Sequence, residues 1–118
     1  MSKIYKYIIQ KLPCAVDPLF SSVADLNNAD RNDIISCTVL CTRAKIYTKT
    51  IQTVKLLRQK KFNEISPLIS RILRLIRIHR MQLYKLSKKT ALDLSNFLYL
   101  KNLSNLLMSL QIYSNDHC

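Results

Sequence analysis

The amino-acid sequence contains no glycine in its 118 residues, whereas average usage of about 7% would place roughly eight. Glycine enters positive φ without strain and lets a backbone approach a ligand closely. Its absence excludes glycine-rich phosphate loops, dinucleotide-binding fingerprints and nucleophile elbows. Tight β-hairpins also lose their preferred turn residue. The chain is best suited to right-handed helices joined by Asn, Asp, Ser and Pro. We therefore predict an all-α fold, a single bundle of four to five helices.

Length and composition predict one helical domain over residues 1–118. About half of the residues, 48%, are hydrophobic, which suits a packed core rather than a disordered tail. Lysines interrupt the first helical segment, so it lacks the apolar centre of a signal peptide. The longest uncharged run, 102–115, is too short and too polar to cross a membrane. We expect a soluble, intracellular protein.

Hydrophobic spacing predicts three helices in the first half of the chain. The first covers residues 3–12 and ends at Pro13, because proline disfavours a helical conformation in the residue before it. A short helix over 18–26 follows Asp17, which would act as its N-cap. The third runs from 34 to 59, although its β-branched residues also allow a strand. Its expected buried seam is spaced three and four residues apart: Cys37, Leu40, Ala44, Tyr47, Ile51 and Val54.

Two further helices are predicted in the second half. After a break at 62–64, Ser66 and Pro67 suit the N-cap and first position of a helix over 67–86. Arginines lie on one side of this helix, and the other side is apolar: Leu68, Ile69, Ile72, Leu75, Ile76 and Leu83. The last helix, 91–113, is apolar around much of its circumference, which indicates the centre of a bundle or an interface with another chain.

The positive charge is concentrated in the middle of the sequence. The chain carries 19 basic and 7 acidic side chains, a formal net charge of +12. Residues 55–90 are +10, whereas the N-terminal helices in 1–54 are +3 and residues 91–118 are −1. Self-repulsion costs stability unless something acidic offsets it, so we expect an anion-binding surface rather than a plain solvated face. The anions are either phosphates or the carboxylates of a protein partner.

No catalytic or metal-binding pattern is visible. The acidic residues lie mostly at expected helix starts, and no pair of them suggests acid–base catalysis. The tyrosines do not interleave with the basic residues as a base-stacking platform would require. We expect no enzyme activity, no cofactor, no metal and no small-molecule substrate. Free, mostly buried thiols are expected, because the cysteines and histidines match no common zinc spacing: Cys14, Cys37, Cys41, Cys118, His79 and His117.

Three segments of the second half form a pattern: LLRQKK at 56–61, RILRLIRIHR at 71–80 and ALDLSNFLYLKNLSNLLMSL at 91–110. This order of a basic lead, an arginine-rich helix and an apolar last helix resembles one subunit of the GINS DNA replication complex, called partner of Sld five, number one. The resemblance implies a partner interface that includes the residues Arg58, Lys60, Lys61, Arg71, Arg74, Arg77, Asp93, Phe97, Leu100 and Lys101.

The resemblance also implies a fold, partners and a location. The family member has an all-α domain that packs mainly against the Sld five subunit within a heterotetramer. This tetramer joins the minichromosome maintenance helicase ring in the nucleus and catalyses nothing itself. The family usually has a Cys and a Tyr between the basic triplet and the arginine helix, whereas Phe62 and Pro67 occupy that region here, with one residue inserted. Leu100 stands where an aromatic residue is usual. The family's C-terminal β domain is absent from these residues.

The charge pattern leaves a second hypothesis open. A stand-alone basic helical protein could use residues 55–90 to grip the backbone of double-stranded RNA or rRNA, in a virus or on a ribosome. No helix-turn-helix or zinc-finger spacing supports base recognition. A steep salt dependence of RNA binding would favour this alternative over a complex subunit.

Overall fold

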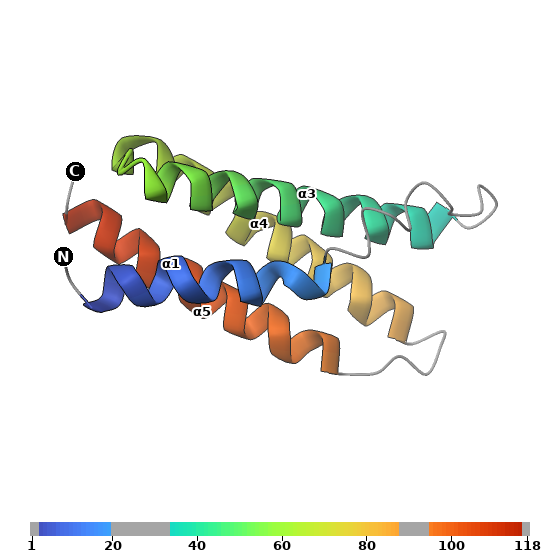
Figure 1. Cartoon of the computed structure of the whole chain (residues 1–118). Helices are drawn as coiled ribbons and strands as arrows, with labels where there is room; N and C mark the ends of the chain where they lie inside the picture. Colours follow the sequence, from blue (N-terminus) through green and yellow to red (C-terminus); the bar gives the residue numbers. More distant parts are fainter. Residues whose placement is uncertain (1–2, 20–33, 88–94, 117–118) are drawn as a thin grey trace.

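The computed structural model describes residues 3–19, 34–87 and 95–116, with the side chains of 38–85 and 98–116 in the later helices. Within these ranges the regular structure is helical and contains no strand, which confirms the predicted all-α bundle. Figure 1 shows the elements in chain order: α1 (Lys3–Val16), the 3₁₀ helix η1 (Asp17–Leu19), α3 (Ile34–Arg58), α4 (Phe62–Ser87) and α5 (Ser95–Asp116).

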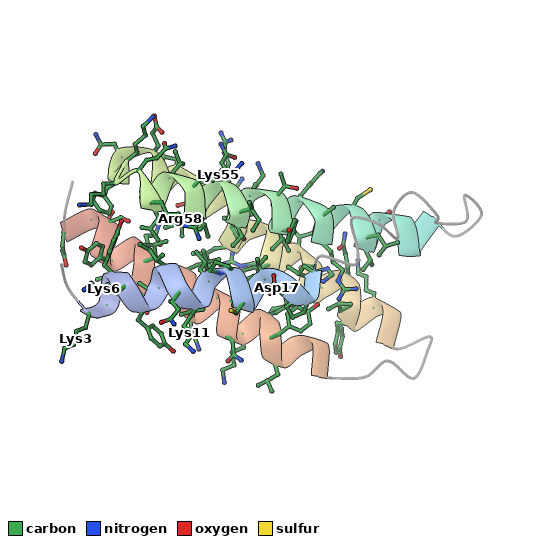
Figure 2. The ribbon with its side chains drawn as sticks, viewed as in Figure 1. Lys3, Lys6, Lys11, Asp17, Lys55 and Arg58 are labelled. Atoms are coloured by element: carbon green, nitrogen blue, oxygen red, sulfur yellow. The ribbon has the colours of Figure 1, made fainter. Side chains whose placement is uncertain are left out.

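The four α-helices are arranged so that α3 and α5 each pack against both α1 and α4. Helices α1 and α4 therefore lie at opposite corners of the bundle (Figure 1). The start of α1 and the end of α5 lie at the same end. Lysines follow the outer side of α1, where Lys3, Lys6 and Lys11 are exposed (Figure 2). Helices α1 and α4, at these opposite corners, thus present separate surfaces to solvent.

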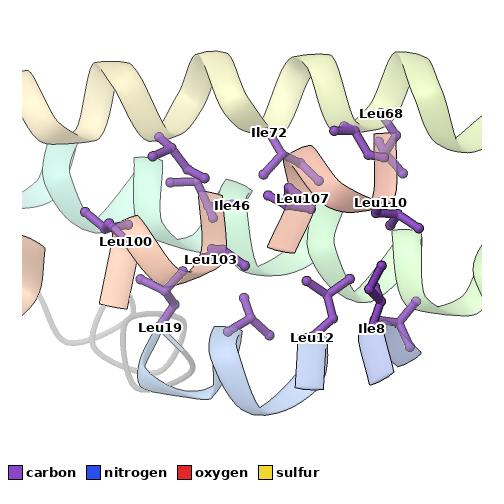
Figure 3. Packing of buried hydrophobic residues seen from close by; sticks show 14 of the residues in the cluster. Ile8, Leu12, Leu19, Ile46, Leu68, Ile72, Leu100, Leu103, Leu107 and Leu110 are labelled. Carbon is purple, nitrogen blue, oxygen red and sulfur yellow. The ribbon is translucent and has the colours of Figure 1, made fainter. Parts of the chain in front are cut away.

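All four helices contribute aliphatic side chains to one continuous core (Figure 3). Leu12 of α1, Ile46 of α3, Ile72 of α4 and Leu107 of α5 are all fully buried. Complete burial of one such side chain contributes about 1.5–3 kcal/mol to folding. Leu100 belongs to the same core and is 0% exposed.

Helix α1 is longer than predicted, because Pro13 lies inside it and the helix ends at Val16. Proline removes one hydrogen bond from a helix interior, here the one to the carbonyl of Ile9. Leu12 and Val16 are four residues apart and both are fully buried, so packing of the last turn offsets that loss. The prediction of a helix over 18–26 is also wrong for its first residues, because a 3₁₀ helix occupies Asp17–Leu19. Its remainder lies outside the described residues.

Helix α3 confirms the helical interpretation of its β-branched segment, but its buried face is displaced from the predicted seam. Within that seam, Leu40, Ala44, Tyr47 and Ile51 are only partly buried, and Val54 alone of the described members is fully enclosed. The side chain of Cys37 lies outside the described set. The buried side chains of α3 are instead Val39, Thr42, Ile46, Thr50, Thr53, Val54 and Leu57.

Three threonines explain the displaced face of α3. The hydroxyls of Thr42, Thr50 and Thr53 each donate to the carbonyl oxygen four residues earlier, at 3.0, 2.8 and 2.8 Å. A buried hydroxyl is costly only when it lacks a hydrogen-bond partner. Because each of these finds one in its own helix, residues that a polarity pattern assigns to the surface face the core instead.

The junction of α3 and α4 uses a lysine where a glycine is usual. Lys60 adopts a positive φ of 57°, the left-handed conformation that commonly ends a helix. The amide of Lys60 donates to the carbonyl of Leu57 at 3.1 Å, and that of Lys61 donates to Leu56 at 3.0 Å. These two bonds form a Schellman motif. Helix α4 then begins at Phe62, so the predicted break at 62–64 and the predicted start at 67 are wrong.

An aromatic cluster explains why α4 begins at Phe62. Its ring lies 6.0 Å from the ring of Tyr5 and 5.9 Å from that of Tyr113, and the two tyrosine rings are 5.5 Å apart. These centroid separations suit stabilising aromatic pairs. The Tyr5 hydroxyl also donates to the carbonyl of Leu57 at the end of α3. The cluster therefore joins all four helices at the end where α1 begins and α5 stops.

Candidate functional site

The outer side of α4 carries three of the arginines that were assigned to the predicted interface. Arg71, Arg74 and Arg77 are exposed, as predicted. On the opposite side, the predicted apolar arc is confirmed: Leu68, Ile69, Ile72, Ile76 and Leu83 are buried and Leu75 is partly buried. At 100° per residue, the helix presents the arginines to solvent because the aliphatic arc is committed to the core.

Large apolar side chains are exposed on the same side of α4, in the turns that follow these arginines. Ile78, Met81 and Tyr84 have exposed fractions of 42%, 58% and 58%. A shallow hollow of about 310 Å³ forms beside Met81 and Tyr84 and is also lined by Arg80 and Lys85. We name this surface the arginine face and define it by Arg71, Arg74, Arg77, Ile78, Met81 and Tyr84. Sequence reasoning missed its apolar members, although their helical angles place them outside the apolar arc.

The positive charge of the arginine face has no local counterpart among the described residues. No salt bridge joins a described acidic side chain to Arg71, Arg74 or Arg77. The acidic residues in the described ranges are Asp17, Glu64 and Asp116. An external anion would therefore not have to displace an internal partner within this part of the chain.

The remaining predicted interface residues are distributed over other elements. Arg58, Lys60 and Lys61 are exposed at the α3–α4 junction, and Lys101 is exposed on α5. Leu100 is enclosed by the core of this chain, so its side chain is not on the surface that a partner would meet. Asp93 and the side chain of Phe97 lie outside the described set. The structure thus groups the α4 arginines on one helix and leaves Lys101 and the three basic residues of the α3–α4 junction exposed elsewhere.

A buried histidine is the strongest electrostatic perturbation in the described residues. His79 is 0% exposed, and neither of its ring nitrogens has a hydrogen-bond partner. The pKa of His79 is lowered to about 4, mainly by burial and also by the positive charge of Arg43, while Gln82 partly opposes the shift. Arg43 itself donates to the hydroxyl of Tyr99 at 2.7 Å. A neutral imidazole at this position is a component of the core, and sequence reasoning had not placed it there.

The described residues contain no cluster of three or more His, Cys, Asp or Glu side chains that could hold a metal ion. Cys14 and Cys41 are free, as expected, but they are exposed rather than buried. Among the described helices, none combines the length and apolarity needed to cross a membrane. Comparisons with protein families, with characterised proteins and with solved structures give no match.

Proposed function

We propose that this chain is a non-catalytic structural subunit of a protein assembly, which it joins by binding an acidic partner surface through the arginine face. The observation that carries this proposal is the mixture of guanidinium groups with exposed Ile78, Met81 and Tyr84 on one side of α4. Arginine, tyrosine and methionine are enriched at protein–protein interfaces, where they supply both charge recognition and buried area. Contact with a nucleic-acid backbone needs the charge but not the apolar side chains.

We further propose that the assembly is a nuclear GINS complex, with the Sld five subunit as the direct partner and the replicative helicase ring as the wider one. Two observations support this. The sequence has the family-like order of basic lead, arginine-rich helix and apolar last helix. The corresponding elements form an all-α bundle in which the arginines of the second segment are exposed.

A second candidate is binding to the backbone of double-stranded RNA or rRNA. The observation in its favour is the row of exposed basic side chains at the α3–α4 junction, Arg58, Lys60 and Lys61. These carry no large exposed apolar neighbours of the kind seen on the arginine face. A contact there would be electrostatic and strongly dependent on salt.

The test is co-expression of the chain with the Sld five subunit of GINS, using two matched double variants. Arg74→Glu with Arg77→Glu reverses two charges on the arginine face, and Lys45→Glu with Lys55→Glu reverses two exposed charges on α3. We expect the wild type and the α3 variant to co-elute with the partner in size-exclusion chromatography. The arginine variant should bind at least about tenfold more weakly, because it places like charges opposite one another.

Two outcomes would contradict the proposal. The first is equal loss of binding in both double variants, which would indicate a response to net charge rather than to this surface. The second is a chain that does not bind the partner but binds duplex RNA with an affinity that falls steeply as salt is added, which would favour the second candidate.

A further inference from the structure

A second surface lies between α1 and α5, on the other side of the bundle from the arginine face. The two helices pack through buried aliphatic residues such as Ile8 and Leu107. Outside this seam, Ile4, Tyr7 and Ile112 remain 58%, 53% and 66% exposed. They are among the residues that line a hollow of about 660 Å³.

This hollow continues along the helices. A second one, of about 570 Å³, shares Tyr7 and Leu106 with the first and reaches Pro18 and Tyr99. We name the combined feature the α1–α5 groove. Helix α1 has 14 residues and is therefore about 21 Å long, so the groove can accommodate a helix of about four turns laid along it.

The charge on the rim of the groove determines which kind of partner helix can bind there. Lys3 lines the first hollow and Lys11 the second, and the Lys11 ammonium lies 6.0 Å from the centre of the Tyr7 ring. Lys6 is a further exposed cation on α1, which contains no acidic residue (Figure 2). Asp116 lines the first hollow and is the one acidic lining residue of the two hollows. The rim is therefore mainly positive over an apolar floor.

We propose that the α1–α5 groove binds an amphipathic helix of a protein partner, with the apolar stripe of that helix in the groove and its acidic flank against the lysines of α1. A helix docked by its apolar face is a common recognition mode, and opposite charges on the rim set its orientation and specificity. A second copy of this chain fits less well, because it would bring lysines against lysines in a protein of net charge +12.

The test uses the full chain and fluorescein-labelled synthetic helical peptides of about 16 residues, close to the length of the groove. The first peptide has leucines spaced three and four apart with glutamates on both flanks. The second replaces every glutamate with lysine, and the third has the first composition in an order without the apolar stripe. Fluorescence anisotropy should show binding of the first peptide, at least about tenfold weaker binding of the other two, and weakening by added salt.

Two matched variants locate the binding site. Ile112→Asp places a charge in the groove, and Met81→Asp makes the same kind of change on the arginine face, where the exposed fraction is comparable. Both positions are exposed, so the fold should tolerate both substitutions, and circular dichroism checks that it does. We expect Ile112→Asp to weaken binding of the first peptide at least about tenfold and Met81→Asp to leave it unchanged.

The proposal is overturned if the three peptides bind alike, if none binds, or if Met81→Asp weakens binding as much as Ile112→Asp. It is also overturned if analytical ultracentrifugation finds a dimer of the chain that Ile112→Asp converts to monomer, because the occupant is then a second copy. This proposal does not rest on the arginine face. The Arg74→Glu, Arg77→Glu double variant tests that surface separately.

Discussion

Lys60 is the residue at which the absence of glycine strains the backbone. Its φ of 57° is strained for a residue with a Cβ, by about 1 kcal/mol or more. We predict that Lys60→Gly raises the free energy of unfolding by about 0.5–1 kcal/mol, because relief of this strain outweighs the greater entropy of the unfolded glycine. Urea denaturation measures the change.

Lys60→Ala is the matched control for this prediction, because it removes the same charge and keeps the Cβ. The alanine variant should be no more stable than the wild type. If alanine stabilises the protein as much as glycine does, relief of charge repulsion among Arg58, Lys60 and Lys61 is the cause, and the conformational explanation is wrong.

His79 makes stability depend on pH. Its pKa is lowered to about 4 in the folded chain by burial and by Arg43, whereas an unfolded histidine titrates near pH 6.5. Between these values the unfolded state binds more protons, so stability falls as pH falls. We predict a loss of about 2 kcal/mol from His79 between about pH 7 and pH 5, measured by urea denaturation at each pH.

His79→Leu supplies the control. Leucine removes the titrating group together with two buried nitrogens that lack partners, so the stability of this variant should vary far less between pH 7 and pH 5. A variant that keeps the full pH dependence of the wild type would assign the effect to other groups.

At the scale of helices, the side chain of Tyr5 joins α1 to the α3–α4 junction. The Tyr5 hydroxyl donates to the carbonyl of Leu57, and the residue is 2% exposed. We predict that Tyr5→Phe lowers the free energy of unfolding by about 1 kcal/mol, the usual net value of one buried hydrogen bond. Tyr7→Phe, on the exposed side of the same helix, should change it by less than about 0.5 kcal/mol. Equal effects at both positions would show that the bond to Leu57 contributes nothing.

The helices also show where sequence reasoning succeeds and where it stops. The orientation of α4 was predictable because its buried residues are all aliphatic apart from His79. The orientation of α3 was not, because the hydroxyls of its threonines are satisfied within the helix, a feature that polarity alone does not reveal. Pro13 and Pro67 were wrongly expected to bound helices, because packing of the surrounding turns outweighs one lost hydrogen bond.

The candidate site, like the helices, was predictable only in part. Spacing placed Arg71, Arg74 and Arg77 on the solvent side of α4, which is correct. The apolar members of the arginine face were overlooked because a hydrophobic residue in a helix is normally assigned to the core. The α1–α5 groove depends on contact between the first and last described helices, which no local pattern in the sequence reveals.

For the molecule as a whole, the net charge of +12 opposes folding of the isolated chain. We predict that the Arg74→Glu, Arg77→Glu double variant unfolds at a higher urea concentration than the wild type, although it binds the partner less well. Added salt should shrink the difference, because it screens repulsion between exposed charges. A double variant that is less stable than the wild type at low salt would contradict this view and would indicate that the arginines stabilise the isolated fold.

The packing of α1 between α3 and α5 has a consequence for the order of events on the ribosome. Helix α1 is synthesised first of the described helices, and α5, which covers one of its sides, is synthesised last. At translation rates of about 5–20 residues per second, a delay of roughly 5–20 seconds separates them. Once α3 has been synthesised, α1 can pair with it but not yet with α5, so the nascent chain exposes apolar surface that the finished bundle covers. Chaperones or a co-translated partner could bind this exposed apolar surface during the interval.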